Sequence, residues 1–203
     1  MVYLYTTYSC EIAIYRLRDR SWTPVFTRNY IWVCVIFYKD NFYSVDQFGV
    51  LRRSLFDKSY SNYKEEVVSS GFKFRCRFRY LVESCSGELL MVVRRLKSCL
   101  DSDGQWRLRT KFFEIFKLNQ SNGDWEVVRS FGDQVLFLSH NDSKFVSVRY
   151  NSEYKDNSIY FIDDLGRRIK SGSEDFDVYD LRNHKVESIK LSHGHRRMHC
   201  QWF

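Results

Sequence analysis

The sequence has little proline, no long apolar run and no export signal. Its 203 residues include one proline, Pro24, where average usage of about 5% would give roughly ten. No uninterrupted apolar run, that of Trp32–Tyr38 included, approaches the roughly 18 residues of a membrane-spanning helix. Met1–Cys10 lacks the basic n-region of a signal peptide. We therefore expect a protein of the cytoplasm, the nucleus or both, neither secreted nor embedded in a membrane.

The usual signatures of enzymes and cofactor sites are also missing. The 9 glycines are dispersed singly, so there is no Gly-rich phosphate loop, and no Gly-x-Ser-x-Gly elbow occurs. Cys85 has no histidine near it in the sequence, and the 6 cysteines lack the spacing of a zinc motif. We expect no enzyme activity, no catalytic residues, no cofactor and no metal site.

Two segments contain the side chains of a metal site without its spacing. The C-terminal segment carries His193, His195, His199 and Cys200, but not the paired ligands of known zinc motifs. The sequence Asp101-Ser-Asp103-Gly104 resembles the start of a calcium loop, yet the closing glutamate does not follow. We interpret the first segment as an atypical tail and the second as a β-turn.

Clustered carboxylates are the remaining candidates for acid–base chemistry. They lie at Asp163-Asp164 and at Glu174-Asp175 with Asp177. General acid–base catalysis requires two such groups to converge in a pocket, and nothing in their spacing predicts this. We interpret them as solvated turn residues.

Aromatic residues are abundant, and they favour strands. The chain has 14 Tyr, 17 Phe and 5 Trp, together 18% of its residues. No long window fits helical spacing better than strand alternation. In Phe72–Tyr80, four aromatic residues and Cys76 alternate with the cations Lys73, Arg75, Arg77 and Arg79. We expect a strand with the aromatic face in the core and the cationic face toward solvent or a partner.

A two-strand unit recurs along the chain. An alternating apolar strand that ends in aromatic-x-Leu, a polar turn and a return strand occur in residues 12–25, 113–128 and 176–189, with a fainter copy in 50–68. Asn122-Gly123 supplies a turn that requires positive φ. Further hairpins are expected in 32–46, turning at Lys39-Asp-Asn41; in 79–95, turning at Ser84–Gly87; and in 135–148, followed by a strand at 159–162.

Paired hairpins at a spacing of very roughly 40 to 60 residues are typical of β-propeller blades. We therefore expect an all-β fold, a partial or small β-propeller of four-stranded antiparallel blades. A β-sandwich is the alternative that the short length favours. The chain has about three and a half such units, whereas closed propellers have about 4 to 8 blades. We expect a propeller domain over residues 1–192, incomplete at its N-terminus, and an atypical tail over 193–203.

An ordered series of segments resembles one plant protein family. The series consists of Tyr80-Leu-Val-Glu-Ser84 with Gly87-Glu-Leu-Leu-Met-Val92, Phe113–Val127, Phe131-Gly-Asp-Gln-Val-Leu-Phe-Leu138, Asn157–Asp164 and Val178-Tyr-Asp-Leu181. Phe42-Tyr-Ser-Val-Asp46 is similar to the preceding blade of the same family. In order and spacing, the chain resembles the plant F-box-associated β-propeller family of the KIB type, domain of unknown function 295.

The resemblance implies a β-propeller that binds a protein, either a ubiquitination substrate or a kinase. In that family the propeller usually follows an F-box that docks on a ubiquitin ligase scaffold. The sequence has no Leu-Pro start of an F-box, and residues 193–203 replace the family's Pro-rich C-terminal segment. We therefore expect a truncated member that does not dock the scaffold by that route.

Positive charge is concentrated in one part of the chain. Between Lys73 and Lys111, 10 basic residues meet 4 acidic ones. Such a patch attracts acidic proteins or nucleic acids. Because the cations of the expected strand face away from its rings, we favour a partner protein with an acidic surface, bound by Lys73, Arg75, Arg77 and Arg79. Nucleic-acid binding through the basic strand 73–79 and an inert gene fragment are the alternatives.

Overall fold

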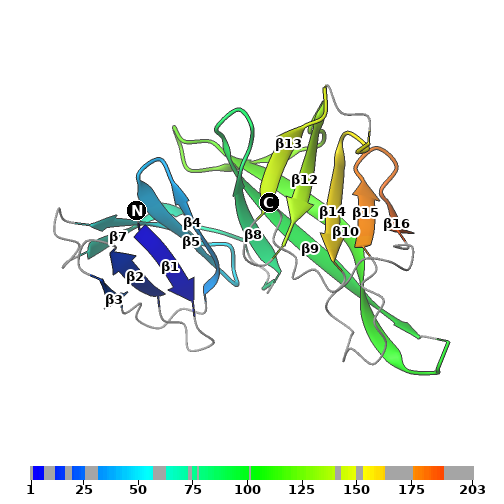
Figure 1. Cartoon of the computed structure of the whole chain (residues 1–203), viewed down its shortest axis with the longest axis horizontal. Helices are drawn as coiled ribbons and strands as arrows, with labels where there is room; N and C mark the ends of the chain where they lie inside the picture. Colours follow the sequence, from blue (N-terminus) through cyan, green and yellow to red (C-terminus); the bar gives the residue numbers. More distant parts are fainter. Residues whose placement is uncertain are drawn as a thin grey trace. The chain divides into compact units, whose positions relative to one another are not determined.

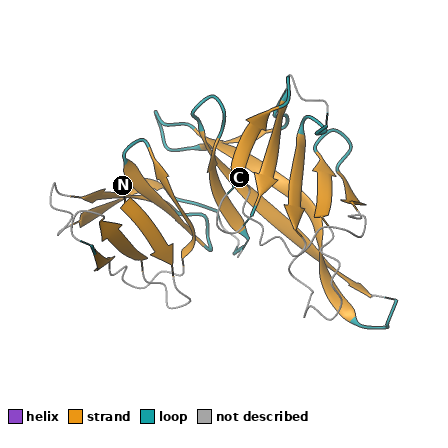
Figure 2. Cartoon of the chain, in the orientation of Figure 1, coloured by secondary structure: helices purple, strands orange, loops and turns teal. Residues whose placement is uncertain are grey.

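In a computed structural model, most of the described residues lie in β-strands (Figure 2). The described residues are 2–6, 12–16, 20–25, 32–56, 63–72, 75–76, 78–100, 102–139, 143–149, 153–162 and 176–189. They form two compact units, Met1–Arg77 and Phe78–Phe203, which we describe separately. Among the described residues, no helix is long and apolar enough to cross a membrane.

The first unit contains two antiparallel sheets. One has the strand order β1-β2-β3 and the other the order β4-β5-β6-β7, so each strand pairs with its neighbour in the sequence (Figure 1). The strands are β1 (Val2–Thr6), β2 (Ile12–Arg16), β3 (Ser21–Val25), β4 (Trp32–Tyr38), β5 (Asn41–Asp46), β6 (Leu51–Phe56) and β7 (Tyr63–Ser69).

The hairpins expected in the first unit are confirmed. Residues 12–25 form β2 and β3, with Ile12 opposite Val25. β4 and β5 turn at Lys39 and Asp40, whose φ angles of 44° and 61° give the tight turn that suits the twist of the strands. The fainter copy forms β6 and β7. These hairpins bury the apolar side chains Tyr38, Phe42, Tyr43, Val45 and Leu51.

The second unit also contains two sheets. One has the order β11-β10-β9-β8 and is antiparallel; the other has the order β13-β12-β14-β15-β16. The strands are β8 (Arg79–Glu83), β9 (Leu89–Leu100), β10 (Trp106–Leu118), β11 (Trp125–Val128), β12 (Gln134–Leu138), β13 (Lys144–Ser147), β14 (Ser158–Ile162), β15 (Phe176–Asp180) and β16 (Lys185–Ile189).

The hairpins expected in the second unit are confirmed as well. They are β8–β9, β10–β11, β12–β13 and β15–β16. Gly87 and Gly123 have φ angles of 76° and 77° in the first two turns, as their positions in the sequence predict. The β-turn expected at 101–104 connects β9 to β10 through the described residues Ser102, Asp103 and Gly104.

The sheet β13-β12-β14-β15-β16 departs from the expected four-stranded antiparallel blade. It has five strands, and β12 and β14 run parallel, with Leu136 opposite Ile159. The segment after β13 is held at the start of β12, because Val148 N donates to Asp133 O and Asn157 N donates to Gln134 O, each at 2.8 Å. β14 therefore enters the sheet at the end where β12 begins, and it runs in the same direction.

The strand expected over Phe72–Tyr80 is wrong in its extent. β8 begins only at Arg79, and the described residues Phe72, Arg75, Cys76 and Phe78 are not in a strand. Instead of a ladder, Phe72 N and Cys76 N donate to the carbonyls of Phe48 and Gln47, each at 2.7 Å. The alternation of aromatic and cationic residues predicts a strand here, but these two hydrogen bonds to a turn distant in the sequence determine the conformation of the segment instead.

The core of the second unit lies between its two sheets. Side chains from β8, β9 and β10 meet side chains from β12, β13, β14 and β15 in one apolar cluster. In this cluster, the ring centroid of Phe113 from β10 lies 5.0 Å from that of Phe161 and 5.3 Å from that of Tyr179. Arg94 covers the ring of Phe161 at 4.9 Å, and its Nε donates to Thr110 Oγ1 at 2.8 Å. This contact joins the two sheets.

The first prediction concerns Phe113. Replacing Phe113 by Ala should lower the free energy of unfolding by about 3–5 kcal/mol, because it leaves a cavity between two sheets. Val127→Ala, at a side chain that is 61% exposed on β11, should cost less than about 1 kcal/mol. Urea unfolding of the two variants measures the difference. Equal losses would show that the core does not lie where we place it.

Candidate partner-binding site

The site begins at a rigid turn after β5. Asp46 Oδ1 accepts hydrogen bonds from Phe48 N at 2.8 Å and Val50 N at 3.0 Å, while Arg52 Nη1 lies 3.0 Å from its Oδ2. The side chains of Asp46 and Arg52 are both buried. A buried carboxylate with this many donors fixes the backbone of residues 46–50, and with it the position of Phe48.

The segment that carries Arg75 is attached to this turn. Besides the two backbone bonds at Phe72 and Cys76, Gly71 packs against the turn with φ +79°. A Cβ at residue 71 would lie 2.6 Å from Val50 N and 2.8 Å from Phe48 O. Only glycine allows this approach, so the turn and the segment around Arg75 form one local structure.

Arg75 is exposed and oriented by two neighbours. Its Nε donates to Gln47 Oε1 at 3.0 Å, and its Nη2 donates to the same oxygen. Its guanidinium lies over the ring of Phe48, 5.6 Å from the centroid, and that ring is itself 39% exposed. A guanidinium held on an aromatic ring loses little further freedom when a carboxylate binds it. We call Gln47, Phe48 and Arg75 the Arg75 patch.

The four predicted partner-binding residues do not form the expected cationic face. Arg75 is exposed, whereas Arg79 is 1% exposed and lies in β8 with its Nη1 3.8 Å from Met91 Sδ. The expectation that Arg79 faces solvent is therefore wrong. Lys73 and Arg77 lie outside the described residues. The sequence does not predict the contacts of Gln47 and Phe48 with Arg75. Gln47 is 28 residues away from Arg75, and a contact at such a separation leaves no local pattern.

The other sequence candidates do not assemble a chemical site. The expectation that Asp177 is a solvated turn residue is wrong, because it is buried in β15 and accepts a hydrogen bond from Ser188 Oγ at 2.6 Å. Cys85 lies in the β8–β9 turn, where burial and the charge of Asp133 raise the pKa of its thiol and so disfavour the nucleophilic thiolate. Outside the described residues lie Asp101, Asp163, Asp164, Glu174, Asp175 and the tail 193–203.

Asp180 is the centre of a polar cluster in the second unit. Its carboxylate accepts hydrogen bonds from Arg182 N at 2.9 Å and Arg182 Nε at 3.2 Å, and Lys155 Nζ lies 3.0 Å from it. Burial alone would raise its pKa, but the bonds from Arg182 and Lys155 outweigh burial and hold the pKa of Asp180 below its usual value. This cluster stabilises the β15–β16 turn.

The second prediction concerns Gly71. Gly71→Ala should destabilise the chain by about 1–2 kcal/mol more than Gly104→Ala. Gly104 has a similar positive φ, but no atom lies within 4 Å of the position that a Cβ would take there. Both variants carry the penalty for positive φ, and only the first pushes a methyl group into backbone. Thermal unfolding of both variants compares them. Equal destabilisation would show that the turn and the Arg75 segment are not in contact.

The third prediction concerns pH. Because the pKa of Asp180 is lowered in the folded state, its contribution is present above the unfolded value of about 3.9 and is lost as pH falls through the folded value. Asp180→Asn should therefore lower stability at pH 7 and flatten the loss of stability below about pH 4. Asp40→Asn, in an exposed turn, should change stability at pH 7 by less than about 0.5 kcal/mol. Urea unfolding at a series of pH values measures these free energies. If Asp180→Asn lost as much stability below about pH 4 as the wild type does, the prediction would be contradicted.

Comparison with known proteins identifies the family. Residues 1–180 match the family described as KIB1-4 beta-propeller. In Arabidopsis thaliana, the chain is 27% identical over 199 residues to a candidate F-box protein, At5g55150, in a match that covers 95% of the chain and 52% of that protein. It is 28% identical over 155 residues to the F-box protein At2g26160, covering 74% and 45%, and 26% identical over 203 residues to the F-box protein SKIP23, covering 90% and 47%.

The chain thus spans about half the length of these curated relatives. The family match covers both units and favours the propeller over the β-sandwich as the description of the fold. The three sheets with four or five strands are consistent with propeller blades. The chain belongs to the KIB1-4 beta-propeller family.

Proposed function

We propose that this chain is a non-catalytic protein-interaction module whose Arg75 patch binds an acidic surface of a partner protein. The observation that carries the proposal is the exposed guanidinium of Arg75, oriented by Gln47 and supported by Phe48. Arginine and aromatic residues are enriched among the anchors of protein interfaces, and an oriented guanidinium can bind a carboxylate through two parallel hydrogen bonds. We propose that this partner is a ubiquitination substrate or a kinase; the family relation supports a protein partner.

The relation to F-box proteins supports an interaction role for the propeller. The curated relatives are named as F-box proteins, and the chain matches about half of each. We propose that the propeller domain comprises residues 1–192, which contain the matched residues 1–180, with 193–203 as a separate tail. The described residues contain no group of three or more His, Cys, Asp or Glu that could hold a metal ion. We propose a cytoplasmic or nuclear location.

A protein partner fits this surface better than a nucleic acid does. The nucleic-acid alternative depends on a continuous basic strand over 73–79, and the described part of this segment contains no strand before Arg79. Arg79 is buried, so it does not contact a phosphate. The remaining cation in the described part of the segment, Arg75, covers the Phe48 ring on which a base would stack.

The fourth prediction tests the patch. Arg75→Glu should weaken binding of an acidic partner at least about tenfold, because it replaces attraction by repulsion at an anchor. Lys185→Glu makes the same charge change at an exposed position of β16 and should leave the affinity within about twofold. Plant proteins retained by the wild-type chain are quantified by mass spectrometry, and the recovered partner is then titrated against each variant.

Two results would contradict the proposed function. Equal retention of the partner by wild type, Arg75→Glu and Lys185→Glu would show that the Arg75 patch is not the site. Retention of nucleic acid alone, with a steep dependence on salt, would show that phosphate contacts dominate and would favour the nucleic-acid alternative.

A further inference from the structure

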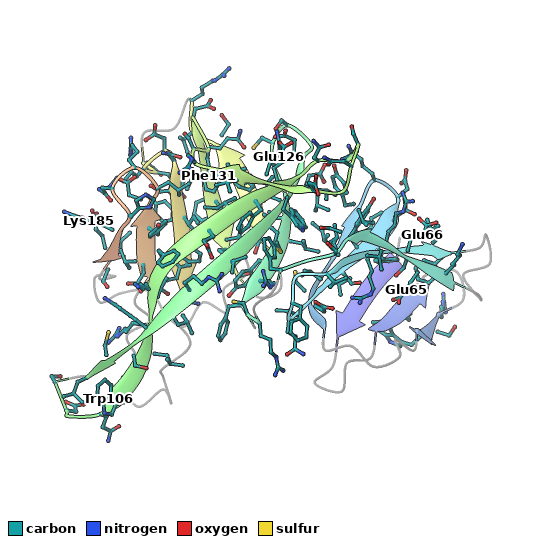
Figure 3. All side chains as sticks on the ribbon, turned by 180° about the vertical axis from the view of Figure 1, so that it is seen from behind. Glu65, Glu66, Trp106, Glu126, Phe131 and Lys185 are labelled. Carbon is teal, nitrogen blue, oxygen red and sulfur yellow. The ribbon has the colours of Figure 1, made fainter. Side chains whose placement is uncertain are left out.

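The β9–β10 hairpin is longer than the sheet that it belongs to. β8 pairs with β9 only from Leu89 to Val93, and β11 pairs with β10 only from Ile115 to Leu118. β9 and β10 nevertheless remain paired as far as Leu100 and Trp106. Residues 96–100 and 106–110 therefore form a two-stranded ribbon, which we call the β9–β10 ribbon. Figure 1 shows it extending beyond its sheet, and Figure 3 shows Trp106 at its outer end.

One face of the β9–β10 ribbon is apolar and exposed. Residues directly opposite each other in an antiparallel ladder point to the same side, and Trp106 lies opposite Leu100. Leu108, two residues further along, shares this face. The exposed fractions of Trp106, Leu100 and Leu108 are 74%, 60% and 44%. Large apolar side chains exposed next to one another at the end of a projecting element are typical of an interaction site.

The opposite face is cationic. Arg109 lies directly opposite Lys97, and Arg107 lies on the same side opposite Cys99. Lys97 and Arg109 are exposed, and Arg107 lies 3.7 Å from Asp103. The described residues of the ribbon and its turn thus carry more cations than acids, so carboxylates of a partner would complement the charge of this face.

We propose that the β9–β10 ribbon inserts into a cleft of a partner protein, with an apolar wall against Trp106 and carboxylates against Arg109 and Lys97. This site is separate from the Arg75 patch, which lies in the other unit. A two-stranded ribbon is marginally stable by itself, and packing on both faces would stabilise it. Tryptophan and arginine are also the residue types most enriched among interface anchors.

The two-sided character disfavours a membrane or a nucleic acid as the occupant. A flat bilayer in contact with Trp106 would meet only one face and leave the cations on the side away from the lipid headgroups. Insertion of the ribbon by its tip would bring Asp103, 3.7 Å from Arg107, toward anionic lipids. A single strand stacked on Trp106 would likewise lie away from the cationic face.

A second copy of the chain also fits poorly. Two ribbons joined through their apolar faces would bury three large side chains from each copy. A standard interface uses about 20–30 residues a side, and the excess positive charge of the opposite faces would play no part in such a dimer. The occupant that uses both faces is a protein cleft with one apolar and one acidic wall.

The fifth prediction tests the ribbon with defined probes. Random peptides displayed on phage are selected against the full chain, and the enriched peptides are synthesised and titrated by fluorescence anisotropy. We expect peptides that combine Leu or Phe with Asp or Glu. Trp106→Ala and Arg109→Glu should each weaken their binding at least about tenfold. Trp22→Ala, at a 52% exposed tryptophan of β3, and Lys185→Glu should leave it within about twofold. Thermal unfolding confirms that each variant is folded.

Four results would overturn the proposal. The first is that no acidic–apolar peptide is selected, and the second is that both ribbon variants bind the peptides as the wild type does. The third is that the chain binds vesicles of phosphatidylserine and phosphatidylcholine, or oligothymidylate, and that Trp106→Ala loses this binding. The fourth is that light scattering shows a dimer, which Trp106→Ala makes monomeric. Arg75→Glu should leave the peptide titration unchanged. The ribbon and the proposed function of the Arg75 patch can therefore fail independently.

Discussion

The packing of Phe113 against Phe161 and Tyr179 holds the two sheets of the second unit face to face. Burial of these rings from water supplies most of the free energy of such a contact, and the edge-to-face geometry of both ring pairs adds a smaller contribution. Arg94 adds to this contact between the sheets, because its buried cation is stabilised by the face of the Phe161 ring and by a hydrogen bond to Thr110. With this core in place, β9 and β10 have a fixed base from which the β9–β10 ribbon projects. The β15–β16 turn is fixed separately by Asp180 and its donors.

The first unit positions its surface by polar rather than apolar contacts. The buried Asp46 carboxylate holds the turn after β5, and Gly71 lets the Arg75 segment approach that turn closely. Arg75 is therefore anchored by backbone bonds on either side and by Gln47 at its end. An interaction module needs such preorganised anchors, because ordering a mobile arginine would reduce the affinity that its contacts supply. The chain thus presents two chemically different surfaces, an oriented guanidinium and a two-faced ribbon.

The sequence predicted the hairpins well because each one is specified locally. Lys39-Asp40 and Gly123 set the turns, and alternation over five or six residues on each side sets the strands. Prediction from the sequence was wrong or incomplete where contacts between residues far apart in the chain determine the structure. Alternation predicted one strand over Phe72–Tyr80, but bonds to Phe48 and Gln47 end that pattern, and Arg79 is buried rather than solvated. The parallel pairing of β12 and β14 depends on bonds from Val148 and Asn157, and the Arg75 patch on Gln47, for which no local signal exists.

The central claim is that the Arg75 patch of this KIB1-4 propeller binds a protein. Hydrogen–deuterium exchange of the chain, measured with and without a purified partner, tests it most directly. The account predicts slower exchange on binding at the backbone amides of the 46–49 turn and of Arg75 and Cys76, which lie beneath the contact. Protection confined to strands elsewhere, with exchange at this turn and at these two residues unchanged, would contradict it.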